Sequence, residues 1–144
     1  MGHILQFNEY LNPKAEFLKR KRDEYEKGVI YHKNMIKDIF QEIIDEYNIE
    51  YYDNDSGNGL YYEIESEDWK GKEYINEIIF EITHMNDKAD AGSGKFGNTN
   101  LIQEIKSAIL PIIGRLKNMG YVVSEIKNPY TNVICLSINY KNLK

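Results

Sequence analysis

The chain has 144 residues, of which 42% are hydrophobic and 28% charged, and its formal net charge is −5. That length suits a single domain with a substantial core, and the hydrophobic fraction argues against global disorder. The sequence has no long uncharged apolar run and no signal-peptide pattern, so we expect no membrane span and a location in the cytoplasm of a bacterial host cell. The single cysteine, Cys135, excludes an internal disulfide and a cysteine-based zinc site, and we expect no cofactor.

A long helix is predicted first, over residues 13–47. Asn12 is suited to cap a helix and Pro13 to occupy its first position. Apolar residues then recur in alternating steps of four and three, as on one face of an amphipathic helix. Gly28 leaves a break into two helices open, because a glycine inside a helix costs about 1 kcal/mol. The N-terminal half has little apolar surface, so it either projects or pairs with a second copy to make a homodimer.

Residues 48–84 are predicted to form an acidic unit of three strands. Two strand-like runs, residues 49–52 and 60–65, flank a segment rich in Asp, Asn and Gly, and this turn chemistry predicts a hairpin. A third strand is predicted over about residues 74–84. The polar residues 85–98 that follow are predicted to form a long loop.

Residues 99–140 are predicted to form a helix followed by a hairpin. The helix is expected to kink near Pro111, which lacks an amide donor, and to end at Gly120. Two β-rich runs, residues 121–127 and 133–140, are predicted to pair across a turn that contains proline.

Taken together, the elements predict an α+β fold in which residues 1–144 form a single domain. Their order is α-β-β-β-α-β-β, with an antiparallel sheet of about five strands and helices packed on one face. A helix with one apolar stripe and a sheet with one apolar face bury each other.

One short motif raises the possibility of an enzyme. Glu125 and Lys127 have the acid-x-Lys spacing of many metal-dependent nucleases, and such a site also needs an acidic residue on an adjacent strand. Glu77 and Glu81 are the candidates for that residue. We keep a small metal-dependent nuclease as an alternative, but this spacing arises often by chance in a chain rich in Lys and Glu. We therefore expect no catalytic and no metal-binding residues.

Charge is distributed unevenly along the chain. Residues 14–37 carry eight Lys and Arg against four Asp and Glu, and residues 91–144 carry seven against two. Residues 38–90 carry three Lys against sixteen Asp and Glu, a net charge of −13. Such a distribution informs on partners and association rates rather than on the fold.

The strongest basic run lies on the predicted long helix. It consists of Lys19, Arg20, Lys21 and Arg22. A basic helix of this kind can bind nucleic acid through the phosphates, although an exposed basic helix is more often simply solvated. We therefore keep nucleic-acid binding as an alternative and rank it below a protein partner.

The acidic strands are the most informative feature of the sequence. Alternate residues share one face of a strand and lie about 6.6 Å apart, comparable to the spacing of phosphates along a nucleic acid. If the strands pair, like charges face one another and destabilise the sheet. Solubility is one explanation, and a surface that binds a basic partner is the other. The predicted partner-binding residues are Glu63, Glu65, Glu67, Asp68, Glu73, Glu77, Glu81, Tyr61 and Trp69.

These observations favour a non-enzymatic protein-binding inhibitor. Its acidic sheet face, rimmed by Tyr51, Tyr52, Tyr61 and Tyr62, would block a basic nucleic-acid-binding host protein such as a defence nuclease. Heavy use of Ile, Lys, Asn and Tyr is typical of AT-rich genomes, which suggests a phage or mobile-element protein of the anti-defence or anti-CRISPR kind.

Overall fold

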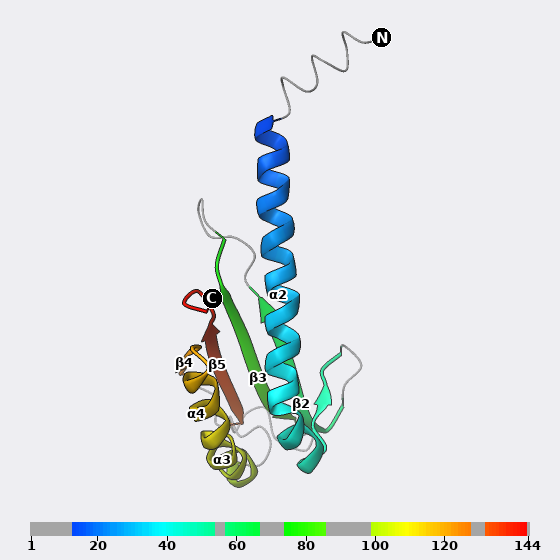
Figure 1. The fold of residues 1–144 in the computed structure, drawn as a ribbon. Helices are drawn as coiled ribbons and strands as arrows, with labels where there is room; N and C mark the ends of the chain where they lie inside the picture. The colour runs from blue at the N-terminus through cyan, green and yellow to red at the C-terminus, as the bar shows by residue number, and fades with distance from the viewer. Residues whose placement is uncertain (1–12, 54–56, 67–73, 86–98, 128–131, 144) are drawn as a thin grey trace.

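The computed structural model describes residues 13–53, 57–66, 74–85, 99–127 and 132–143, and eight helices and strands lie within them. Their arrangement confirms the expected α+β fold with a long N-terminal helix and a five-stranded sheet (Figure 1). In chain order they are α2 (Pro13–Glu46), β1 (Glu50–Tyr51), β2 (Gly59–Ser66), β3 (Glu77–Met85), α3 (Thr99–Ala108), α4 (Leu110–Asn118), β4 (Val122–Glu125) and β5 (Val133–Asn139).

Helix α2 is continuous over 34 residues and passes through Gly28 without a break. At the usual rise per residue it is about 50 Å long. Its C-terminal half lies on the sheet, whereas residues 13–24 are all exposed and project beyond the sheet (Figure 1). The division follows from the apolar stripe, which is dense only in the second half. The buried residues of α2 are Val29, Ile36, Phe40, Ile43 and Ile44.

The sheet has the strand order β1-β2-β3-β5-β4. All neighbouring strands are antiparallel except β1 and β2, which are parallel, so the sheet is mixed. The hairpin predicted around residues 49–65 is therefore wrong. Turn-forming residues predict that the chain reverses, but they do not say how often, and a parallel pair needs a second reversal before β2 begins. Strand β1 is also only two residues long, with Tyr52 donating a backbone hydrogen bond to Tyr62 O at 3.0 Å.

The core lies between the sheet and the helices that cover one face of it (Figure 1). Alternate residues of β3 and β5 point into it, and the ring of Phe40 from α2 stacks on that of Phe80 with centroids 4.2 Å apart. Period-two alternation thus separates the two faces of each central strand, as the sequence predicts. The most buried core residues of β3 and β5 are Ile78, Phe80, Ile82, Ile134, Leu136 and Ile138.

The predicted helix of residues 99–119 is divided into α3 and α4 at Ile109. Pro111 lies in the first turn of α4, where its missing amide donor does no harm. Helix α4 ends at Asn118, and Gly120 follows its C-cap residue Met119 as expected, with a φ of 105° that favours glycine. The amide of Tyr121 then donates to Leu116 O at 3.1 Å, which closes the helix end. None of the helices in the described ranges is long and apolar enough to cross a bilayer.

Candidate acidic protein interface

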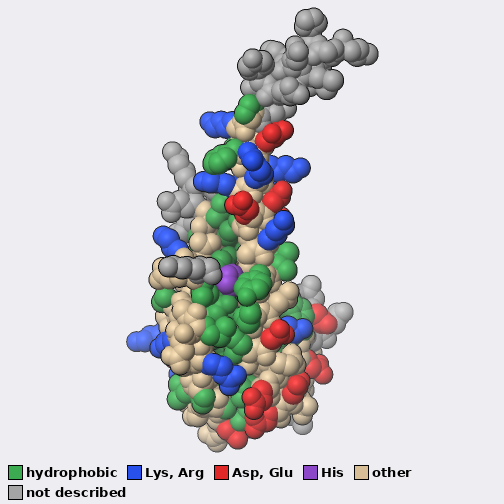
Figure 2. All heavy atoms as spheres, viewed as in Figure 1, with side chains coloured by type: hydrophobic (Ala, Val, Ile, Leu, Met, Phe, Trp, Pro, Cys, Tyr) green, Lys and Arg blue, Asp and Glu red, His purple; other side chains and the backbone are tan. Residues whose placement is uncertain are grey.

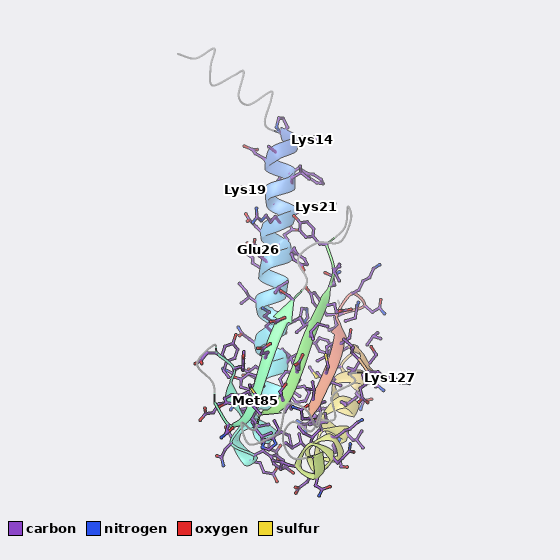
Figure 3. All side chains as sticks on the ribbon, turned by 180° about the vertical axis from the view of Figure 1, so that it is seen from behind. Lys14, Lys19, Lys21, Glu26, Met85 and Lys127 are labelled. Carbon is purple, nitrogen blue, oxygen red and sulfur yellow. The ribbon has the colours of Figure 1, made fainter. Side chains whose placement is uncertain are left out.

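One face of the sheet carries side chains that point away from the helices, and we call it the open face. In the view from behind, β2, β3 and β5 lie in front of α2 (Figure 3). The register of the strands assigns its members by alternation with the buried core residues. They are Tyr61, Glu63 and Glu65 of β2, Glu77, Ile79, Glu81 and Thr83 of β3, Val133, Cys135, Ser137 and Asn139 of β5, and Val122 and Ser124 of β4.

Four glutamates lie together on the open face. Glu63 is directly opposite Glu81 in the antiparallel register of β2 and β3. Glu65 follows Glu63 on the same side of β2, and Glu77 precedes Glu81 on the same side of β3. The structure therefore brings together these four predicted residues. Of the other five residues predicted on this surface, Tyr61 lies on β2, and Glu67, Asp68, Trp69 and Glu73 lie outside the described residues.

The electrostatics of these glutamates reflect their proximity. Burial raises the pKa of Glu63 above its ordinary value, and the charges of Glu65 and Glu81 raise it further. The Thr83 hydroxyl donates to Glu81 Oε1 at 3.3 Å. The ion pairs between described residues join Arg22 to Glu26 and Lys106 to Glu125, so neither neutralises the glutamates of the open face.

Cys135 lies in the middle of this face, opposite Glu81. Its side chain is buried, and burial together with the charges of Glu81 and Glu77 raises the pKa of its thiol. A thiol held in its neutral form is a poor nucleophile. Cys135 therefore belongs to the apolar part of the face, beside Ile79 and Val133, rather than to a catalytic site.

The tyrosines do not all lie where the sequence suggested. Tyr62 points into the core, where its ring packs near Phe80, so its predicted place at the rim of the acidic face is wrong. Tyr61 has the parity of the open face, but it is only 6% exposed and its hydroxyl donates to Asn58 O at 3.1 Å. Its ring meets that of Tyr52 edge-on with centroids 6.0 Å apart. Tyr61 and Tyr62 cannot both lie on the open face, because neighbouring residues of a strand point to opposite faces.

One further carboxylate was missed by the reasoning from sequence. Glu50 is exposed and is in register with Tyr61 through the parallel pairing of β1 and β2. It therefore extends the negative charge to the edge of the open face. No sequence signal placed it there, because the predicted hairpin would have given β1 a different register.

The residues proposed for a nuclease are separated in the structure. Glu125 points to the helix side of the sheet, where it forms an ion pair with Lys106 Nζ at 2.7 Å. Glu77 and Glu81 lie on the open face, so they cannot share a metal ion with Glu125 there. Across the ranges that the structure describes, no group of three or more His, Cys, Asp or Glu side chains could hold a metal ion.

The basic run lies on the projecting half of α2. Lys19, Arg20, Lys21 and Arg22 are all exposed, but consecutive residues on a helix are turned by about 100°, so they point to different sides. Figure 3 labels Lys19 and Lys21 on opposite sides of the helix. Acidic side chains are mixed among the basic ones along this segment (Figure 2), and Arg22 is paired with Glu26 at 3.1 Å. The run does not form one continuous basic face.

Comparison of the chain with protein families, with curated proteins and with solved structures finds no match.

Proposed function

We propose that this chain is a non-enzymatic binding protein whose open face binds a basic surface of another protein, one that itself binds nucleic acid. Occupation of that basic surface would make the chain an inhibitor. The more specific form of the proposal, an anti-defence protein of a phage or mobile element, depends in addition on the residue usage of the sequence.

The observation that carries the proposal is the direct opposition of Glu63 and Glu81 on a face that the helices leave uncovered. Facing like charges destabilise a sheet by tenths of a kcal/mol, and fold stability gains nothing from them. A basic partner removes that cost on binding. It is also steered toward the negative surface, which raises the association rate.

The composition of the open face is consistent with a protein interface. Ile79, Val133 and the buried Cys135 give it an apolar middle, and the glutamates of β2 and β3 lie beside them. Protein interfaces commonly combine a core depleted in charge with a polar rim. An extended sheet face also offers a broad contact area rather than a cleft for a small substrate.

The test removes the charges while it preserves the shape. Wild-type protein is immobilised to capture partners from a bacterial lysate, and direct binding to each purified partner is then measured with and without competing DNA. We expect the triple variant E63Q/E65Q/E81Q to lose binding, and DNA to compete with the wild type. The control variant E16Q/E24Q/E42Q removes three exposed charges from α2 and should bind normally. Equal loss in both variants, or no loss in the first, contradicts the proposal.

Direct nucleic-acid binding is distinguished by a mobility-shift assay with DNA and RNA at low salt. Under the proposal the wild type gives no shift. A shift that disappears when Lys19, Arg20, Lys21 and Arg22 are replaced by alanine would instead support the helix as a nucleic-acid-binding element.

A further inference from the structure

The free edge of β4 is the feature that this inference concerns. Among the strands that the structure describes, β4 is the last in the order of the sheet and pairs with β5 alone (Figure 1). The amide of Ile126 donates to Cys135 O at 2.9 Å, which makes residues 126 and 135 a hydrogen-bonded pair. Since such pairs alternate in an antiparallel ladder, the backbone N–H and C=O groups of Val123 and Glu125 point away from β5. An edge of this kind is a template for another strand.

We propose that this edge pairs with β4 of a second copy of the chain, antiparallel and about a two-fold axis through Ser124. In this register Val123 lies opposite Glu125 of the second copy, and Glu125 lies opposite its Val123. Both residues of each pair present outward backbone groups, so the two pairs form four hydrogen bonds. If the register were shifted by one residue, backbone groups that point out from the edge of one copy would lie opposite backbone groups of the other copy that point toward its own β5. A shift of two residues toward the C-terminus would set Glu125 against its own copy.

The side chains of β4 support the same register. Val122 is 52% exposed and Ile126 is 41% exposed, although both are large and apolar. Both belong to the open-face side of the strand, and the two-fold axis sets each of them opposite the other in the second copy. Cross-strand pairs of β-branched residues stabilise a sheet, and they lie closest where the pair is not hydrogen bonded, as here. The axis thus covers four exposed apolar side chains with one another.

The helix side of β4 also presents apolar surface that a second copy could cover. A cavity of about 200 Å³ lies between β4 and the helices α3 and α4, and Leu110, Ile113 and Val123 are among its lining residues. Leu110 is 62% exposed. The carboxylate of Glu125 lies at this cavity and is already paired with Lys106 at 2.7 Å, so covering it would not leave a lone buried charge.

Because the proposed two-fold axis is perpendicular to the sheet, the open faces of the two copies lie on one side of the combined sheet and their helices lie on the other. The two cavities would therefore adjoin beneath the helices, and the two open faces would join into one surface of ten strands. The dimer neither requires nor implies the proposed function, because the open face is present in each copy alone.

Sedimentation equilibrium of the full chain over a range of concentrations tests the inference. We expect the wild type to approach twice 16.9 kDa at high concentration. V122K/I126K sets like charges across both apolar pairs and should weaken association about tenfold or more. V122K/I126E sets opposite charges across the same two pairs and should restore the dimer. Ile30→Lys changes an apolar residue that is 60% exposed on α2, and should leave the dimer intact.

Several outcomes would overturn the inference, provided that circular dichroism shows each variant to be folded. A wild type that stays monomeric at every concentration overturns the inference. So does a dimer that persists in V122K/I126K, or one that fails to return in V122K/I126E. A dimer that is lost in Leu18→Lys but retained in V122K/I126K would assign the contact to the projecting half of α2.

Discussion

Replacing Glu81 by glutamine should make the protein more stable. The substitution removes one of two facing charges between β2 and β3, and glutamine keeps an oxygen that can accept the hydrogen bond from the Thr83 hydroxyl. Most substitutions in a folded protein destabilise it, so a gain in stability would be a specific result of the opposition between Glu63 and Glu81.

The magnitude follows from the geometry of the pair. Charged cross-strand pairs contribute about 0.2–1 kcal/mol, and like charges act in the unfavourable direction. Glu63 and Glu81 are both partly exposed, so solvent screens their repulsion and the lower half of that range applies. We therefore expect a gain of about 0.2–0.6 kcal/mol, or an increase of about 1–2 °C in the melting temperature.

Urea unfolding at several pH values and salt concentrations measures the effect. The pKa of Glu63 is raised in the folded state, so the folded carboxyl keeps its proton to a higher pH than the unfolded one. The stability that this contributes is present at acidic pH, below the unfolded pKa, and is lost as the pH rises through the raised folded pKa. The advantage of Glu81→Gln should accordingly be absent at acidic pH, appear as the pH rises to neutral, and shrink at high salt.

The matched control is Glu77→Gln, on the same strand and the same face. Glu77 lies opposite Asn139, so its replacement removes no directly facing charge and should change the midpoint less. A Glu81→Gln variant that is equally stable or less stable than the wild type at neutral pH and low salt would refute the account of the open face. Stabilisation by the control to the same extent would assign the effect to net charge alone.

Three further predictions concern the fold. Phe40→Ala should reduce the free energy of unfolding by about 3–5 kcal/mol because the ring is fully buried, whereas Phe17→Ala, half exposed, should change it by less than about 0.5 kcal/mol in the same urea titration. Burial lowers the pKa of His32 from its ordinary value of 6.5. The stability that the neutral, buried ring contributes is therefore present above pH 6.5 and is lost as the pH falls below that value. The urea midpoint should drop more on acidification in the wild type than in His32→Asn. Gly120→Ala should reduce the free energy of unfolding by about 1–2 kcal/mol, measured by calorimetry, because Gly120 has a φ of +105°. Gly28→Ala should increase it by up to about 1 kcal/mol, because Gly28 lies in open space within a helix. An increase at both positions would contradict this assignment.

Much of the local structure could be predicted because it depends on neighbouring residues. The apolar steps of four and three continue across Gly28, and α2 is indeed unbroken. Pro111 lies in the first turn of α4, next to the division of the second long helix at Ile109, as expected for a residue that is tolerated at a helix start and not in a helix interior. The alternation of Ile134, Leu136 and Ile138 places them in the core because strand side chains alternate between faces.

The candidate interface could be predicted only in part. Parity placed Glu63 and Glu65 on one face of a strand and Glu77 and Glu81 on one face of another, but nothing in either segment says which residue of one strand opposes which of the other. The wrong place for Tyr62 has a different origin, because Tyr62 shares its parity with Leu60 and Ile64, opposite to that of Glu63 and Glu65, and this alternation already indicates the core.

The sequence alone therefore determined, to within a few residues, where the long helix and the central strands lie, and it determined which side of β3 and β5 is apolar, because these depend on backbone sterics and side-chain periodicity over a few residues. The tertiary structure decided that β1 runs parallel to β2, that Glu63 faces Glu81, and that β4 is left at the edge. Those features arise from contacts between segments far apart in the chain, where several registers satisfy the same local pattern and only packing of the whole core selects one.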